Sequence, residues 1–334
     1  MIVALADDLT GALEVGAQFT AHGVPSRVTI SAAVSKEFLN VFDMESRHLA
    51  PDLAERIVTS LTPASARLVY LKTDSTLRGN IAAGMRALSR VFPDSPIAYV
   101  PAYPELGRTV RDGRLFVDGI PVHEAGFAND PLNPVRDSSI ADLLGRDLPC
   151  VIHDGETTDD VADAVTAALA DSRCRIIAGP ASVAAALAAR IGTSRQSTFQ
   201  PPSIRSCLIV NGSLHETSAR QITYAEANCP KWQVLKPPIH PSTTPLEIAA
   251  ETAQTVIRRC ESHTVDAIMI FGGDTAYGIL KELGCAWLEP LGEVIPGVPV
   301  SRVPGRKLHL ITKAGGFGDE SLVCRIQQIL HATN

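Results

Sequence analysis

Four side chains with complementary chemistry stand within the seven residues from Lys72 to Arg78. Lys72, Asp74, Ser75 and Arg78 follow the apolar run 67–71, which is predicted to be a buried strand. Arg78 is suited to bind a carboxylate through two hydrogen bonds, and Lys72 can offset charge on a phosphoryl group during transfer. Asp74 can orient or deprotonate a hydroxyl, and Ser75 adds a further polar contact for a hydroxylated acid. The plainer interpretation is a solvated loop in which Lys72 and Asp74 pair with each other.

Two adjacent aspartates form the second candidate group. Asp7 and Asp8 come directly after the apolar run 2–6, and open α/β sheets place their ligands at such strand ends. One carboxylate can cap the helix expected over 11–22, which leaves the other for a substrate hydroxyl or a magnesium ion. Simple capping is the alternative. Arg108 follows a glycine in a proline-bearing loop and is a further candidate ligand for an acid group.

Three turns rich in small residues follow predicted strands in the C-terminal half. They are Gly212 with Ser213, the run Gly272, Gly273, Asp274 and Thr275, and the run Lys313, Gly315, Gly316 and Gly318. Glycine lets the backbone approach a ligand, and the N–H groups at a helix start favour phosphate. One such turn can simply be a tight connection, but three predict a cradle for a phosphate chain. No G-x-x-x-x-G-K-[ST] sequence is present, and too few residues follow Gly318 for a dinucleotide-binding fold.

The order of the expected elements predicts the fold class. Apolar runs alternate with helical patterns over most of the chain, which is typical of an α/β protein with parallel sheets. A polar, proline-bearing stretch at 200–206 separates two ordered patterns. We therefore expect two domains, 1–202 and 203–334, each a largely parallel sheet flanked by helices, with the active-site cleft between them. A hairpin and a proline-rich loop between 111 and 134 form an insertion that either covers a site or contacts another copy.

Composition excludes several classes of function. The 334 residues are 45% hydrophobic and 20% charged, so the chain can bury large cores. A net charge of -6 gives no general attraction to nucleic acid or to anionic membranes, and we expect neither as a partner. The seven cysteines are scattered, which predicts neither a zinc site nor a disulfide framework. No signal peptide or membrane-spanning run is evident, and a reducing cytoplasm is the expected location.

Taken together, these motifs resemble the four-carbon acid sugar kinases, the family of threonate, erythronate and 3-oxo-tetronate kinases. The resemblance is carried, in the same order along almost the whole chain, by residues 6–12 (ADDLTGA), 72–80 (KTDSTLRGN), 101–110, 121–124 with 130–134, 272–275 (GGDT) and 312–318 (TKAGGFG). It implies an N-terminal acid-sugar-binding domain, a C-terminal nucleotide-binding domain and ATP-dependent phosphorylation of a terminal hydroxyl. Ser213, the Gly272 to Thr275 turn and Gly315 would hold ATP. Two departures are that Leu214 and His215 stand where many members have Cys-Ser, and that the chain is shorter than longer members between Thr223 and Val265.

The resemblance and the residues together give an expected mechanism of in-line transfer with Mg2+ and ATP on the C-terminal glycine turns, where Lys313 and Gly316 also contact the nucleotide. Arg78 and Arg108 hold the acid carboxylate, and Lys72 or Lys313 offsets charge on the transferring group. Any of Asp7, Asp8 and Asp74 can position the accepting hydroxyl. A sugar-acid sensor without catalysis and a nucleotide-dependent dehydrogenase are the alternatives, and a homo-oligomer is left open.

Overall fold

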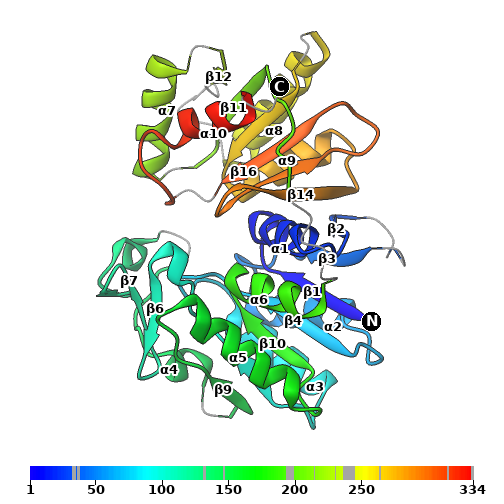
Figure 1. Cartoon of the computed structure of the whole chain (residues 1–334), viewed down its shortest axis with the longest axis vertical. Helices are drawn as coiled ribbons and strands as arrows, with labels where there is room; N and C mark the ends of the chain where they lie inside the picture. Colours follow the sequence, from blue (N-terminus) through cyan, green and yellow to red (C-terminus); the bar gives the residue numbers. More distant parts are fainter. Residues whose placement is uncertain are drawn as a thin grey trace.

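The computed structural model describes residues 1–31, 35, 38–130, 133–145, 147–192, 199–213, 215–229, 231–235, 245–262, 265–313 and 316–331. It has two lobes stacked along the long axis (Figure 1). We call residues 1–192 the N-lobe and residues 199–331 the C-lobe. The predicted α/β class with two sheet-based units is confirmed.

The N-lobe is built on a parallel sheet with the strand order β2-β3-β1-β4-β10-β5-β9. Its strands are β1 (Ile2–Ala6), β2 (Ser26–Thr29), β3 (Leu39–Asp43), β4 (Leu68–Lys72), β5 (Ile97–Tyr99), β9 (Cys150–Ile152) and β10 (Ile176–Gly179). All five residues of β4 are buried, as is typical of a central parallel strand covered on both faces. The sheet therefore holds its carboxyl-end loops on a rigid, fully covered base.

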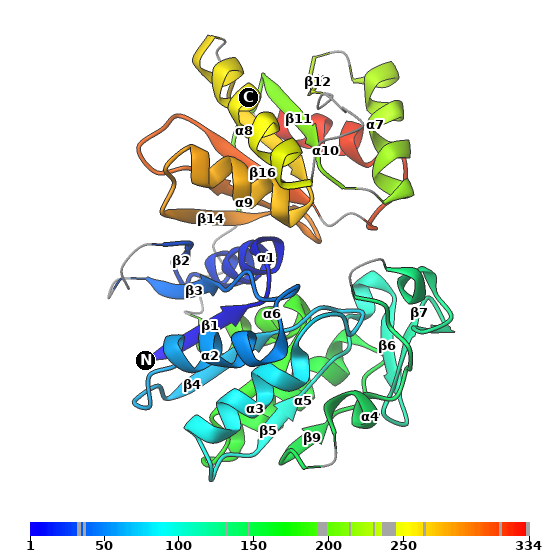
Figure 2. The ribbon, with the colours of Figure 1, turned by 180° about the vertical axis from the view of Figure 1, so that it is seen from behind.

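Helices cover both faces of this sheet. They are α1 (Leu9–Ala21), α2 (Pro51–Leu61), α3 (Ile81–Val91), the short α4 (Ile140–Leu144), α5 (Thr158–Ala170) and α6 (Ala181–Ile191). Helix α2 packs against α3 on one face, while α6 packs against α1 and α5 on the other. Figure 1 shows α5 and α6 in front of the sheet, and Figure 2 shows α2 and α3 from behind. The predicted alternation of strands and helices is confirmed.

The predicted insertion forms a small antiparallel sheet at one side of the N-lobe. It contains η1 (Pro104–Leu106), β6 (Arg108–Arg111), β7 (Arg114–Val117), β8 (Ile120–Pro121) and η2 (Gly126–Asn129). Both residues of each two-residue turn have positive φ, with Asp112 at 50° and Gly113 at 66°, and Asp118 at 49° and Gly119 at 81°. This is the type I′ geometry that matches the twist of paired strands. The hairpin predicted within the insertion is confirmed by the pairing of β7 with β8.

The C-lobe combines four parallel strands with an antiparallel hairpin, in the order β12-β11-β13-β16-β15-β14. The strands are β11 (Cys207–Asn211), β12 (Gln233–Leu235), β13 (Ala267–Phe271), β14 (Trp287–Ile295), β15 (Val298–Arg302) and β16 (His309–Lys313). The helices are α7 (Glu216–Asn228), α8 (Pro245–Ser262), α9 (Gly273–Glu282) and α10 (Leu322–His331). Helices α7 and α10 pack together, and α8 packs on α9 (Figure 2).

The two lobes share one continuous sheet, which the sequence analysis did not predict. Strand β14 pairs antiparallel with β2, with Trp287 opposite Thr29 and Leu288 opposite Val28, so that 13 strands form a single sheet. Helix α1 packs against β14 and β15 as well as against its own lobe. The sequence pattern does not indicate the hairpin of β14 and β15, because glutamates, a proline and a glycine interrupt the apolar residues of β14. Its alternating burial shows the period of two that a strand requires.

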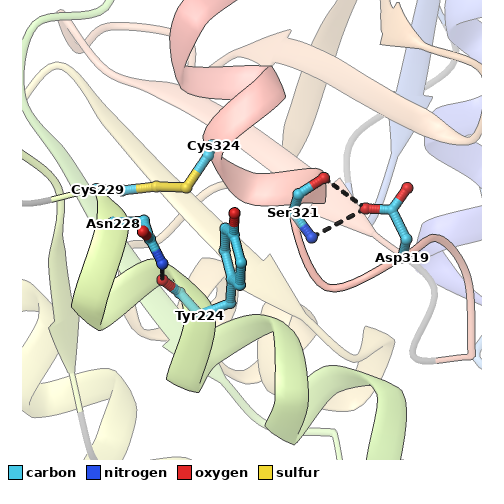
Figure 3. Close-up of a disulfide and its surroundings, with 6 residues drawn as sticks. All are labelled: Tyr224, Asn228, Cys229, Asp319, Ser321 and Cys324. Carbon is cyan, nitrogen blue, oxygen red and sulfur yellow. Dashed lines mark hydrogen bonds between the residues drawn. A yellow bond between two sulfur atoms is a disulfide. The ribbon is translucent and has the colours of Figure 1, made fainter.

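A disulfide joins Cys229 to Cys324, which corrects the expectation that the scattered cysteines build no disulfide framework. The two residues are 95 positions apart in the chain, and their Cα atoms are 5.8 Å apart. Cys229 ends α7 and Cys324 lies in the first turn of α10, so the bond fastens these two helices together (Figure 3). Scattered cysteines carry no sequence signal for such a pair, because only the packing of the two helices brings the sulfurs together. In the described part of the chain, no helix has the length and apolar character needed to span a membrane.

Candidate active site

The carboxyl ends of three neighbouring strands gather the polar residues of the N-lobe. Strand β1 lies between β3 and β4, with Ala6 opposite both Asp43 and Lys72. The segments that follow these strands therefore meet at one edge of the sheet. They bring together Asp7 and Asp8 after β1, Arg47 after β3, and Lys72 and Asp74 at the end of β4.

Arg47 is the centre of this group, and the sequence analysis did not single it out. Its Nε and Nη2 donate to the two carboxylate oxygens of Asp7 at 2.7 and 2.9 Å. Its Nη1 lies 2.8 Å from Asp8 Oδ2, and Nη2 lies 3.7 Å from Asp74 Oδ2. One guanidinium thus contacts three carboxylates. A charged residue shortly after a strand next to β1 is the signal that could have indicated it.

Asp8 has two separate contacts, one structural and one electrostatic. Its Oδ1 accepts a hydrogen bond of 2.8 Å from the Gly11 N–H and caps α1, while Oδ2 contacts Arg47. Burial raises the pKa of Asp8, but the charges of Arg47 and Lys72 and the Gly11 N–H outweigh it, so that the pKa lies below its ordinary value. Asp8 is therefore ionised at neutral pH.

Asp74 is the most heavily bonded of the aspartates. Its Oδ1 accepts from the Thr76 N–H at 2.8 Å and from Arg78 Nε at 3.1 Å, and its Oδ2 accepts from Arg78 Nη2 at 2.7 Å. Burial opposes ionisation, but Arg78 and Arg47 hold the pKa of Asp74 well below its usual range. The Lys72–Asp74 pair of the plainer interpretation is replaced by Asp74 with Arg78. Ser75 is half-buried in the same loop.

The insertion contributes to the same site. Arg78 Nη1 donates to Asp130 at 3.0 Å, and Phe127 lies between two arginines, with its ring centroid 5.3 Å from Arg78 Cζ and 5.8 Å from Arg108 Cζ. Among the described residues, no acceptor reaches the buried Nε of Arg108, whereas its Nη1 donates to the Leu106 carbonyl. Of the two functions predicted for the insertion, covering a site is the one that these contacts support.

The three predicted turns of the C-lobe meet one another. A Cβ placed on Gly212 would lie 1.8 Å from Thr275 Oγ1, and one on Gly272 would lie 3.3 Å from the Gly212 carbonyl carbon. A Cβ on Gly316 would lie 3.1 Å from Nε2 of His215, which caps α7 through its Nδ1. Ser213 Oγ accepts from the His215 N–H at 3.2 Å. Gly315 and the Asp274 side chain lie outside what the structure describes.

Lys313 lies beneath these turns. It is fully buried, and its Nζ is 4.8 Å from the centroid of the Phe271 ring. Burial lowers the pKa of Lys313 to about 7. Burial also lowers the pKa of His215, and the positive charges of Lys313 and Arg78 lower it further. Positive charges from both lobes therefore act on His215, which follows the Gly212–Ser213 turn.

The glycine turn after β13 faces the aspartates of the N-lobe. A Cβ on Gly273 would lie 3.5 Å from Thr10 Oγ1 and 3.7 Å from Asp8 Oδ2. Gly273 is also the first residue of α9, so the positive end of this helix lies next to Asp8. Here a residue of the C-lobe set lies next to Asp8 of the N-lobe set. In the described residues, no cluster of three or more His, Cys, Asp or Glu side chains is suited to hold a metal ion.

Two family models match the chain in the order of its lobes. A sugar-binding N-terminal domain matches residues 2–149, and a nucleotide-binding C-terminal domain matches residues 242–323. The D-threonate kinase of Bordetella bronchiseptica is 28% identical over 394 residues, covering 98% of this chain and 96% of the relative. The 3-oxo-tetronate kinase of Methylobacterium radiotolerans is 24% identical over 404 residues, with 94% and 95% covered. The chain belongs to the four-carbon acid sugar kinase family.

Solved structures share the fold of this kinase family member. A crystal structure from Salmonella typhimurium LT2 has a TM-score of 0.77 at 20% identity, covering 98% of each chain. A Bordetella bronchiseptica protein with bound citrate, a domain-swapped dimer, has a TM-score of 0.52 at 25% identity, covering 99% of this chain and 98% of the other. The 394 aligned residues exceed the 334 of this chain, so the Bordetella kinase has segments that this chain lacks. That these fall between Thr223 and Val265 stays a prediction.

Proposed function

We propose that this chain transfers the terminal phosphoryl group of ATP to a hydroxyl of a four-carbon acid sugar. The observation that carries the proposal is the approach of the Gly273 turn to Asp8. One partner is the positive end of a helix, which favours phosphate, and the other is an ionised carboxylate able to orient a hydroxyl. In-line transfer requires these two groups to face each other.

The C-lobe turns would hold ATP. Ser213, the Gly272 to Thr275 run and Gly316 supply backbone N–H groups and hydroxyls close to one another, and α7 and α9 begin at these turns. Lys313, with its pKa of about 7, can be charged when phosphate binds and offsets the negative charge there. Gly315 is retained as a proposed ligand on the resemblance alone.

Asp8 is our choice for the carboxylate that positions the accepting hydroxyl. Asp74 is committed to Arg78 and Thr76, and Asp7 and Asp8 are each bound through both oxygens, so position relative to the C-lobe separates the last two. Asp8 Oδ2 is the carboxylate oxygen nearest to the Gly273 turn. A carboxylate with a lowered pKa is a weak base, so its main contribution is orientation, which suits the loose transition state of phosphoryl transfer.

The acid carboxylate of the substrate would bind on the side of the insertion. Arg108 offers a buried Nε without an acceptor among the described residues, and a carboxylate would satisfy it. Arg78 can join this contact only by sharing donors that now serve Asp74 and Asp130. Lys72, buried beside Asp8, is proposed to offset charge on the transferring group.

Magnesium is proposed as the partner of ATP. The described residues fit an ion carried mainly by the phosphates, since no protein cluster of three ligands is present among them. Such an ion would neutralise phosphate charge. A cytoplasmic location and a homo-oligomer stay proposals, the second supported by the domain-swapped dimer of the Bordetella bronchiseptica protein.

The test is ADP release with Mg2+, ATP and D-threonate, D-erythronate or 3-oxo-tetronate as the acceptor. We expect one acid to stimulate release, and we expect Asp8→Asn to reduce kcat about 100-fold or more. Asp171→Asn, at the end of α5 in an ion pair with Arg173, is the control. Binding of an acid without ADP release would indicate a sensor, and acid-dependent reduction of a nicotinamide cofactor would indicate a dehydrogenase.

A further inference from the structure

Arg47 is held in place from three sides before any ligand binds. Its main-chain N–H donates to the Asp7 carbonyl at 3.2 Å. Asn80 Nδ2 donates at 2.8 Å to the carbonyls of Ser46 and Leu49, the residues on either side of this segment. Gly79, at φ 85°, packs on the arginine stem, since a Cβ there would lie 3.1 Å from Arg47 Cγ. The guanidinium therefore reaches the carboxylates from a fixed base.

The contacts of this guanidinium differ from those of a substrate ligand. All three of its nitrogens already lie within 3 Å of a carboxylate of Asp7 or Asp8, and the side chain is 13% exposed. Arg108, in contrast, has a buried donor without an acceptor among the described residues. The planar guanidinium contacts Asp7, Asp8 and Asp74 through three nitrogens in a fixed geometry, whereas a lysine would have one nitrogen for all three.

We propose that Arg47 is a positioning residue for Asp8, whose Oδ2 it fixes toward the glycine turn of the C-lobe. This inference rests on the proposed function. The Asp8 Oδ1 bond to the Gly11 N–H and the Oδ2 bond to Arg47 Nη1 together set the plane of the carboxylate. Without Arg47, Oδ2 loses its one partner among the described residues and Asp8 keeps only its cap.

Arg47 also sets the electrostatic balance around Asp8. The charged and titratable groups that act on Asp8 from the packed elements are Arg47, Lys72, Asp74, Glu14 and Asp43. Removal of the arginine leaves Lys72 as the one cation in this set, against the three acidic groups Asp74, Glu14 and Asp43. Like charges in a buried site favour protonation, so the pKa of Asp8 should rise in an Arg47 variant.

The experiment compares Arg47→Gln and Arg47→Lys with Arg86→Gln. Arg86 bonds Glu55 at 3.0 Å on the outer helices and serves as the control. We expect Arg47→Gln to lower kcat about 100-fold or more while the KM for ATP changes little, and to move the acid limb of the pH-rate profile to higher pH. Arg47→Lys, which keeps the charge, should restore the position of the acid limb and recover only part of kcat.

Carboxyl NMR titration of Asp8 in the wild type and in each variant gives a readout that does not need turnover. A raised Asp8 pKa in Arg47→Gln, restored in Arg47→Lys, supports the inference. An unchanged Asp8 pKa and pH profile in folded variants overturns it, even if thermal stability falls. Absence of acid-dependent ADP release in the wild type would defeat the proposed function, and the NMR titration alone would then decide the role of Arg47.

Discussion

Gln18 in α1 donates a hydrogen bond of 2.7 Å to Glu293 in β14 and so links the two lobes. Glu293 also accepts from the Gly297 N–H at 3.2 Å. Burial and the nearby charge of Glu14 raise the pKa of Glu293 to about 8, and burial raises that of Glu14 to about 7. The lobes therefore meet at two carboxyl groups that are partly protonated near neutral pH.

Because of this contact, we expect the free energy of unfolding of the protein to fall as pH rises. Glu293 has a higher pKa in the folded protein than in the unfolded chain, so its contribution is complete below about pH 4.5 and is lost as pH rises through 8. The loss approaches about 1.4 kcal/mol per pH unit for one group. Glu293→Gln removes this pH-dependent contribution of Glu293. The Tm of the variant relative to that of the wild type should therefore rise as pH increases from 5 to about 9.

Thermal unfolding across this pH range checks the prediction. Glu289→Gln, on the same strand but in an ion pair of 3.0 Å with Arg302, is the matched control and should show no such trend. A constant Tm difference between Glu293→Gln and the wild type would contradict the assignment of Glu293 as a protonated interface group.

Gln221 carries the second prediction. This fully buried side chain of α7 donates through Nε2 to the carbonyls of Phe317, Gly318 and Asp319 at 2.9, 3.0 and 2.9 Å. Gln221→Leu removes the donor and leaves three partly buried carbonyls without this partner, which costs about 1–3 kcal/mol. Because this segment continues the Gly316 turn, we also expect the KM for ATP to rise several-fold.

Denaturant unfolding and steady-state kinetics test both parts. Arg220→Ala, one position earlier on the exposed side of α7, is the control and should leave both measurements near wild-type values. A stability loss without a change in KM would show that Gln221 supports α10 and not the nucleotide turn.

The disulfide gives the third prediction. Cys229→Ser should lower stability by about 2–4 kcal/mol under oxidising conditions, because the bond closes a long loop in the unfolded chain. Under reducing conditions, which hold in a cytoplasm, the variant and the wild type should unfold at similar temperatures. Cys260→Ser, at a free cysteine, is the control. Intact mass after air oxidation should show two fewer hydrogens, and a full set of free thiols would contradict the pairing.

The sequence predicts those contacts of the site that follow from the order of the strands, and it does not predict the others. Asp7 and Asp8, and Lys72 and Asp74, are two separate candidate pairs in the sequence, and the structure brings them together because the carboxyl ends of neighbouring parallel strands meet at one edge. The glycine turns of the C-lobe meet for the same reason. Both groups are local to strand ends, where sequence signals are strong.

The contacts that were missed depend on tertiary structure. Arg47 lies four residues beyond β3, and its role is visible only once β3 is known to lie beside β1. The hairpin of β14 and β15 joins the lobes through a strand whose partner, β2, is far away in sequence. The Cys229–Cys324 bond depends on the packing of α7 against α10. A local sequence pattern alone indicates none of these three contacts.

The last prediction concerns the short distance between Gly273 and Asp8. In Gly273→Ala the new methyl would lie 3.5 Å from Thr10 Oγ1 and 3.7 Å from Asp8 Oδ2, ordinary contact distances that the fold can accept. Alanine also favours the first turn of α9 by up to about 1 kcal/mol over glycine. In the proposed mechanism, the methyl would stand where the phosphoryl group passes from ATP to the hydroxyl.

We therefore expect Gly273→Ala to keep or slightly raise Tm while kcat falls at least ten-fold, because about 1 Å of misplacement is enough for such a loss. Gly212→Ala should instead destabilise the C-lobe, since its Cβ would overlap Thr275 Oγ1 at 1.8 Å. Gly126→Ala, with nothing within 4 Å of the new Cβ, is the control for both. Wild-type kcat in a stable Gly273→Ala protein would mean that the phosphoryl group does not pass between this turn and Asp8.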